Sequence, residues 1–144
     1  RSEVEQVNTA LVDDLLEQGY VPVIAPIGVG KDGESYNINA DYVAAEIAGA
    51  LQAEKLLLLT DIEGIYKDFE DKSTFLSTLH LPEARQYIRE GIIAGGMIPK
   101  VQSALDTTRQ GVGSVHIIDG RVKHALLLEI LTDLGTGTAI CTTL

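Results

Sequence analysis

A run of four consecutive leucines, residues 56–59, constrains the fold of this chain more than any other stretch. The run follows Lys55 and ends at Thr60, so it has polar ends but no polar face. A continuous apolar run of this length is typical of a strand that is buried on both faces of a parallel sheet. Because parallel neighbours need long crossover connections, usually helices, the run predicts an α/β fold with a central parallel strand over residues 55–60.

Apolar runs and helical periodicities alternate along the rest of the chain, which agrees with this fold class. Further buried strands are expected over residues 21–27, 114–119 and 138–141. Helices are expected between the Asn8 cap and Gly19, and over residues 40–51, 83–90, 97–110 and 123–131. The glycine-rich residues 28–34 and the acidic residues 66–74 are each predicted to form a loop or a hairpin. We therefore expect a mainly parallel sheet sandwiched by helices.

Composition limits the number of domains and the kinds of partner. The 144 residues, 45% of them hydrophobic, suffice for one ordinary core, so residues 1–144 are expected to form one domain. With 21 acidic and 11 basic residues the net charge is −10, which argues against a nucleic-acid partner because nucleic acids are polyanions. No apolar run approaches the ~18 residues of a membrane span, and the start is not signal-like. We expect no membrane partner and a cytoplasmic location.

The first candidate site is the run YNINAD at residues 36–41, between an expected strand and an expected helix. Asn39 is a natural helix N-cap, and Asp41 then falls in the first turn, where the helix dipole favours a carboxylate. Asn37 adds a second amide near the carboxyl end of the strand, which is where ligands bind in open α/β sheets. Simple capping and turn formation explain the same three residues, so the pattern leaves both interpretations open.

Lys100 is the second candidate, because it follows two glycines at the start of an expected helix. The amides of Gly95 and Gly96 can face phosphate oxygens, and the first helical turn presents the lysine beside them. A lysine at this end opposes the helix dipole, which a purely structural arrangement would avoid. A solvent-exposed lysine beside a helix start is the simpler alternative.

The third candidate is the stretch DIEGIY at residues 61–66, which directly follows Thr60. It begins at the carboxyl end of the expected central strand, where a nucleotide lies in an α/β fold. Gly64 allows the backbone to approach a ligand closely. A strand end followed by an Asx turn is the alternative interpretation.

Four segments, in the same order, resemble the N-acetylglutamate kinases of the amino-acid kinase family. They are YNINADYVAAE (36–46), LLTDIEG (58–64), GGMIPKV (95–101), and HIIDGR followed by HALLLE (116–121 and 124–129). Each motif alone is modest, but four in the family's order are specific, and the resemblance covers nearly the whole chain. It implies the C-terminal, nucleotide-binding lobe of the amino-acid kinase fold, without the N-terminal substrate lobe that precedes it in the family.

The resemblance also implies roles for the candidate residues. Lys100 stabilises the transferring phosphoryl group, Asp41 organises catalytic lysines, and Asn37 and Asn39 bind the acetylglutamate substrate. The residues that line the ATP site are Asp61, Ile62, Glu63, Gly64, Ile65, Tyr66, Ile92, Ile93 and Ala94. Mg²⁺ is implied with the nucleotide, held largely by phosphates and water, so no residue is assigned as a metal ligand.

Within that family, the resemblance is to the arginine-inhibited branch. There the positions of His116, Glu129, Gly135 and Gly137 help to hold feedback arginine, and a carboxylate with backbone carbonyls suits a guanidinium group. From the residues alone, a half-buried polar histidine is the simpler explanation of His116. The branch also implies a homo-oligomer, and some of its members bind a regulator of the PII type.

Together these features predict ATP-dependent phosphorylation of the γ-carboxylate of N-acetyl-L-glutamate, a step of arginine biosynthesis. In the family the N-terminal lobe carries a second lysine, a glycine-rich loop and a substrate-gripping arginine, so this chain alone is expected to be inactive. Two alternatives stay open. One is another amino-acid kinase, such as carbamate or aspartate kinase, and the other is a non-catalytic regulatory module that binds arginine or a nucleotide.

Overall fold

The computed structural model describes residues 4–133 and 135–142. The helices are α1 Ala10–Glu17, α2 Ala40–Ala50, α3 Leu81–Arg89, α4 Met97–Arg109 and α5 Ala125–Leu131, with a 3₁₀ turn η1 at Lys72–Thr74. The strands are β1 Ile27–Val29, β2 Ser35–Asn37, β3 Lys55–Thr60, β4 Ile65–Tyr66, β5 Phe75–Leu76, β6 Thr78–His80, β7 Ser114–Asp119 and β8 Gly137–Cys141. None of the helices in these described ranges has both the length and the apolar character that a membrane crossing needs.

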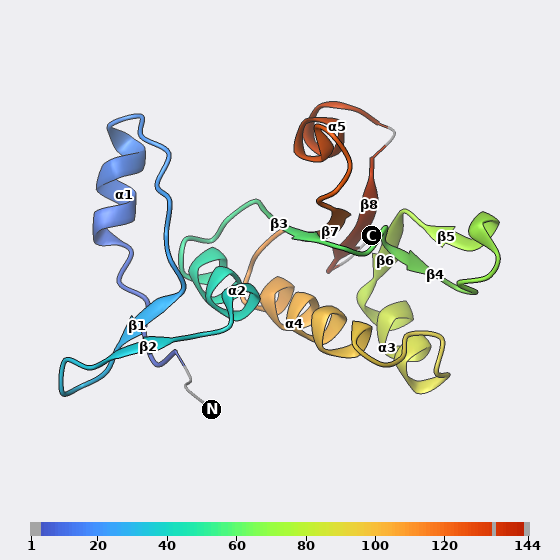
Figure 1. The fold of residues 1–144 in the computed structure, drawn as a ribbon, viewed down its shortest axis with the longest axis horizontal. Helices are drawn as coiled ribbons and strands as arrows, with labels where there is room; N and C mark the ends of the chain where they lie inside the picture. Colours follow the sequence, from blue (N-terminus) through green and yellow to red (C-terminus); the bar gives the residue numbers. More distant parts are fainter. Residues whose placement is uncertain (1–3, 134, 143–144) are drawn as a thin grey trace.

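A four-stranded sheet in the order β3-β7-β8-β6 forms the centre of the molecule. The pairs β3–β7 and β6–β8 are parallel, and β7–β8 is antiparallel. Helices α2, α4 and α3 lie along one side of the sheet and α5 lies on the other (Figure 1). The expected α/β sandwich with a mainly parallel sheet is confirmed.

The hydrophobic core lies between the sheet and α4. Val101 and Leu105 of α4, Val115 and Ile117 of β7, and Ile140 of β8 are each at most 1% exposed. The i, i+4 spacing on the helix and the i, i+2 spacing on the strand place these side chains on the two facing surfaces. Full burial of one such side chain stabilises the fold by roughly 1.5–3 kcal/mol, so this layer holds α4 against the sheet.

Strand β3 has the expected bounds, but the expected central position is wrong within the described residues. It is an edge strand that pairs only with β7 in the described sheet. Leu58 faces the core and is 6% exposed, whereas Leu59 on the opposite face is 51% exposed. A run of leucines is compatible with burial on both faces, but burial also requires neighbours on both faces, and these come from distant parts of a chain.

The buried strand expected over residues 21–27 is also wrong. Only Ile27 belongs to a strand, and the side chains of Val21 and Val23 are 88% and 95% exposed. The segment contains two prolines, which lack N–H donors, and no described strand pairs with residues 21–26. An apolar run forms a strand only where a partner takes its backbone hydrogen bonds.

Both segments predicted as loops or hairpins are hairpins. Strands β1 and β2 pair antiparallel around residues 30–34, and β4 pairs antiparallel with β5 around residues 67–74. The first hairpin and α1 lie at one end of the molecule, and the second hairpin lies at the other (Figure 1). Strand β6, three residues long, is too short to give a sequence pattern and was not expected.

Candidate functional site

A cavity of about 610 Å³ lies between the first turns of α2 and α4. Four of the sequence candidates line it, namely Asn37, Asn39, Asp41 and Lys100. They come from three separate elements, because Asn37 ends β2, Asn39 and Asp41 begin α2, and Lys100 lies in the first turn of α4. The structure therefore brings together the residues predicted for substrate binding and catalysis.

Helix α2 begins at residue 40 because Asn39 caps it. The Asn39 side-chain oxygen accepts a hydrogen bond from the Tyr42 amide at 3.1 Å, and Asp41 lies in the first turn as expected. The capping interpretation of Asn39 is confirmed. The cap uses the side-chain oxygen and leaves the N–H groups of the Asn39 side chain as donors for a ligand.

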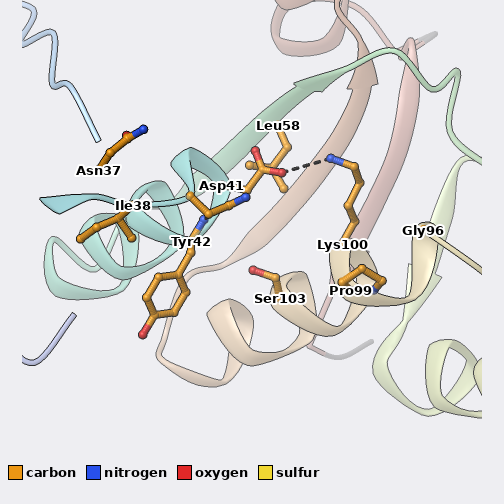
Figure 2. Close-up of a pocket in the computed structure, with 10 residues that line it drawn as sticks. Asn37, Ile38, Asp41, Tyr42, Leu58, Gly96, Pro99, Lys100 and Ser103 are labelled. Atoms are coloured by element: carbon orange, nitrogen blue, oxygen red, sulfur yellow. Dashed lines mark hydrogen bonds and ion pairs between the residues drawn. The ribbon is translucent and has the colours of Figure 1, made fainter. Parts of the chain in front are cut away.

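Asp41 and Lys100 form an ion pair across the cavity, with 3.1 Å between Lys100 Nζ and Asp41 Oδ2 (Figure 2). Their side chains are 43% and 26% exposed, so the pair is worth only about 0–1 kcal/mol of stability. Its main physical effect is to hold an ammonium group where two helices begin. Helix starts favour anions, and a lysine held there adds a full positive charge for an anionic ligand.

Two further residues of the cavity, Tyr42 and Ser103, were not predicted from the sequence. Ser103 follows Lys100 by three positions on α4, so the two side chains share one face of the helix (Figure 2). That spacing is the signal that could have identified Ser103. Tyr42 immediately follows Asp41, and no sequence signal distinguished it from the other residues of α2.

The segment of residues 61–66 leaves the sheet at the carboxyl end of β3. Thr60 Oγ1 accepts a hydrogen bond from the Ile62 amide at 3.0 Å, so a threonine side chain, in place of the expected Asx, forms the turn. Thr60 pairs in register with Asp119 of β7, and the Gly120 amide donates to the Thr60 carbonyl at 2.8 Å. The loops after β3 and β7 are thereby hydrogen-bonded to each other at the carboxyl ends of these two strands.

Within this segment, Glu63 is exposed, whereas Gly64 and Ile65 are buried. Glu63 accepts hydrogen bonds from the Tyr66 hydroxyl at 2.7 Å and from Lys72 Nζ at 2.9 Å. The Tyr66 hydrogen bond, followed by that of Lys72, lowers the pKa of Glu63. Gly64 has φ +142°, and a Cβ there would lie 2.6 Å from the Phe75 ring, so the residue must be a glycine.

The other predicted wall of the ATP site, Ile92, Ile93 and Ala94, lies between α3 and α4. Ile93 is 2% exposed and belongs to the hydrophobic core, and its amide donates to the Tyr87 carbonyl at 3.0 Å. Its side chain therefore packs inward, while Ala94 is exposed. In the described residues, neither this segment nor residues 61–66 line the cavity that holds Lys100, so the structure does not bring the two ATP segments into that cavity.

Asp119 and Arg121 form a fork-like pair beside residues 61–66 that the sequence did not single out. Arg121 donates to the two Asp119 oxygens at 2.9 and 2.8 Å through its guanidinium, and its amide donates to Oδ1 at 2.9 Å. These hydrogen bonds lower the pKa of Asp119 to about 2. Asp119 raises the pKa of Arg121 most, and the charges of Asp61 and Glu63 raise it further.

The four predicted effector residues lie close together on the face of β7 that points away from α4. His116 Nδ1 lies 2.6 Å from Glu129 Oε1, and their side chains are 13% and 6% exposed. Glu129 Oε2 accepts from the Thr136 amide at 2.5 Å, inside the turn between Gly135 and Gly137. Burial raises the pKa of Glu129, but the hydrogen bonds from His116 and Thr136 outweigh it, so the net shift is downward.

The fold and these sites define the class of protein. Residues 1–119 match the model of the amino acid kinase family, and the chain belongs to this family. A solved structure of N-acetylglutamate synthase from Neisseria gonorrhoeae, complexed with coenzyme A and L-arginine, superposes with a TM-score of 0.83 at 30% identity. That superposition covers 95% of this chain and 31% of the synthase.

Within the family, the chain is similar to acetylglutamate kinases. It is 54% identical over 138 residues to the acetylglutamate kinase of Syntrophomonas wolfei subsp. wolfei, and 56% identical over 136 residues to that of Desulfitobacterium hafniense. These alignments cover 96% and 94% of this chain but 48% and 46% of the two kinases. The chain spans about half the length of the curated relatives it matches.

Proposed function

We propose that the protein containing this chain is an acetylglutamate kinase, which transfers the γ-phosphoryl group of ATP to the γ-carboxylate of N-acetyl-L-glutamate. The observation that carries the proposal is the Lys100–Asp41 pair at the cavity between α2 and α4. The relatives at 54% and 56% identity, which are named acetylglutamate kinases, support this reaction.

Phosphoryl transfer to a carboxylate brings negative groups together, so the enzyme must supply positive charge and position. A carboxylate oxygen forms a bond to the γ-phosphorus while the bond to the bridging oxygen breaks, and ADP leaves with that electron pair. The Lys100 ammonium stabilises the charge on the transferring phosphoryl oxygens. Asp41 keeps this ammonium directed into the cavity through the 3.1 Å ion pair.

The remaining candidates hold the two substrates in this proposal. Asn37 and the side-chain nitrogen of Asn39 donate hydrogen bonds to the acid, and residues 61–66 with residues 92–94 contact ATP. Nowhere in the described ranges do three or more His, Cys, Asp or Glu side chains group closely enough to hold a metal ion. In this proposal Mg²⁺ enters as part of the MgATP co-substrate, bound by phosphates and water.

The test is a coupled assay of ADP release by the full-length protein with N-acetyl-L-glutamate, carbamate or aspartate as the acceptor. We expect ADP formation with N-acetyl-L-glutamate only. ADP formation with carbamate or aspartate instead would identify a different amino-acid kinase. MgADP binding without turnover on any of the three acids, together with arginine binding by calorimetry, would indicate a regulatory module.

We also propose that arginine inhibits the full-length enzyme by binding at His116, Glu129 and the Gly135–Gly137 turn. A buried, ionised carboxylate supports this proposal because it suits a guanidinium group, and the similar N. gonorrhoeae synthase was crystallised with L-arginine. The Glu129 oxygens accept hydrogen bonds from His116 and from Thr136, and a carboxylate has about four lone-pair sites, so a guanidinium N–H can be accepted beside these donors.

Glu129→Gln is expected to shift the arginine inhibition midpoint to higher concentration and to leave uninhibited turnover nearly unchanged, because the two sites are distinct. The measurement is the reaction rate as a function of arginine concentration. His124→Gln is the matched control, since His124 lies at the start of α5 and is exposed. An unshifted midpoint in the Glu129 variant would remove Glu129 from the effector site.

A further inference from the structure

Thr138 of β8 has a fully buried hydroxyl that both donates and accepts a hydrogen bond. Its residue exposure is 0%. Thr138 Oγ1 accepts from the Ile65 amide at 2.8 Å and donates to the Leu76 carbonyl at 2.6 Å. Both partners are main-chain groups of the β4–β5 hairpin, so one side chain of the central sheet fixes the backbone on both strands of this hairpin.

The approach of residues 61–66 to Thr138 depends on Gly64. A Cβ at residue 64 would lie 2.9 Å from Thr138 Oγ1 and 2.6 Å from the Phe75 ring. The Ile65 side chain is 3% exposed and joins the hydrophobic core, so the segment is held from its apolar side as well. Because of this close contact, Thr138 Oγ1 can accept directly from a main-chain amide without a bridging water.

Strand β8 is a rigid base for this contact. It pairs with β7 on one side and with β6 on the other. Gly137, the residue before Thr138, lies so close to β7 that an added Cβ would overlap the Ile117 carbonyl oxygen. The Thr138 hydroxyl is thus fixed by the sheet, and the backbone of residues 61–66 conforms to it.

We propose that Thr138 is a positioning residue for nucleotide binding, which acts by holding the backbone of residues 61–66 in one conformation. The proposal rests on the assignment of this segment to the nucleotide under the proposed function. Thr138 itself does not contact the nucleotide. Its contribution is to order the segment before the ligand arrives, so that binding does not have to supply that ordering.

Thr138→Val tests the proposal because valine keeps the shape of threonine but removes the hydroxyl. The Ile65 amide and the Leu76 carbonyl then lose their partner in a buried position, which makes the segment rearrange. Thr138→Ser restores the hydroxyl. Thr108→Val is the matched control, since Thr108 is 2% exposed and its hydroxyl donates to the Leu105 carbonyl at 3.0 Å, inside α4.

The first measurement is MgADP affinity of the full-length protein by calorimetry, at a temperature where all variants are folded. We expect Thr138→Val to weaken binding by roughly tenfold, the equivalent of one lost buried hydrogen bond. KM for ATP should rise while kcat changes less, Thr138→Ser should bind nearly as wild type, and Thr108→Val should lose thermal stability without losing affinity. Wild-type affinity in Thr138→Val would overturn the proposal.

The second measurement is amide hydrogen exchange of residues 62–66 without nucleotide. Thr138→Val should exchange faster there than wild type and Thr108→Val, and Thr138→Ser should not. If the wild-type protein failed to bind MgADP, the nucleotide assignment of the proposed function would be wrong, and the exchange rates would still decide whether Thr138 holds the segment. Equal exchange in all four proteins would show that it does not.

Discussion

Lys100 and Asp41 are 59 residues apart in the sequence, yet their side chains form an ion pair at 3.1 Å. Each group is more than a quarter exposed, so solvent screens the pair and its contribution to stability is small. The geometry is more informative than the energy. The ion pair fixes a positive charge beside the cavity, where an anionic ligand can meet it.

In the full-length protein, Lys100→Ala is expected to lower kcat by on the order of 10²–10³, with a smaller change in ATP affinity, because the role proposed for the lysine is to stabilise charge that develops in the transition state. Steady-state kinetics with varied ATP measures both quantities. Arg109→Ala is the matched control, since Arg109 is another α4 cation in an ion pair, with Asp106, outside the cavity. An unchanged kcat in Lys100→Ala would falsify the assignment.

Arg121 lowers the pKa of Asp119 through its hydrogen bonds. The pKa of Asp119 is about 2 in the folded protein, below its usual value of 3.8, so the ionised carboxylate stabilises the fold above about pH 4. This stabilisation is lost as the pH falls from about 4 through 2, when the carboxylate becomes protonated in the folded state too.

Arg121→Gln removes the guanidinium fork, so the folded-state pKa of Asp119 should rise towards its usual value. We expect a lower melting temperature than wild type near neutral pH, and a difference that narrows as the pH falls from about 4 to about 2. The effect is measured as the difference in melting temperature between variant and wild type, by thermal unfolding at a series of pH values from about 2 to 7. Arg109→Gln, which breaks an exposed pair on α4, serves as control. A constant difference at all pH values would contradict this prediction.

At the scale of the elements, the close pairing of β7 with β8 requires a glycine at residue 137. Gly137 pairs with Ile118 in register, and a Cβ at residue 137 would lie 2.1 Å from the Ile117 carbonyl oxygen. The obstacle is backbone, so no side-chain rotation relieves it. The contact fixes where β8 starts, and with it the position of Thr138 and the turn that holds Thr136 near Glu129.

Gly137→Ala is therefore expected to destabilise the protein by at least about 2–3 kcal/mol, because the two strands must separate or shift. Gly96→Ala is the control. Gly96 has φ −67°, and among the described residues nothing lies within 4 Å of an added Cβ, so its stability should change by no more than about 1 kcal/mol. Urea unfolding at equilibrium compares the unfolding free energies of the two variants. Similar values would show that β7 and β8 accommodate an added methyl group without a large loss of stability.

At the scale of the whole molecule, the residues proposed for phosphoryl transfer and the segment proposed for nucleotide binding lie on one chain. Lys100, Asp41 and residues 61–66 lie on this chain, which spans about half the length of the kinases it matches. Orientation of two reactants can supply about 7–11 kcal/mol of a reaction barrier, and it needs groups on both sides of the reacting atoms.

We expect residues 1–144, purified by themselves, to bind MgADP weakly and to show no acetylglutamate-dependent ADP release. The melting temperature should rise only slightly with millimolar MgADP, because stabilisation grows as RT ln(1 + [L]/Kd) and Kd is high. A thermal scan beside a coupled ADP-release assay, on protein of confirmed mass, measures both. Turnover with acetylglutamate would show that these residues suffice for catalysis, and an absent shift would contradict nucleotide binding by this chain.

The sequence by itself determined the elements whose signals are local. Asn39 caps α2 because its side chain reaches an amide three residues away, and α4 starts beside Gly96 and buries Val101 and Leu105 because they share one helix face. The bounds of β7 were likewise predicted from its apolar run. The resemblance to the family supplied roles for Lys100 and Asp41, but no local pattern places them 3.1 Å apart.

Only the tertiary structure decided where each strand lies and what covers it. The leucine run of β3 is at an edge, residues 21–26 are not in a strand, and β8 runs antiparallel to β7, because pairing and burial depend on residues far away in the chain. The same holds for the contacts of Lys100 with Asp41 and of Thr138 with Ile65. Local propensity arises between neighbours in sequence, whereas these contacts exist only once distant segments have packed together.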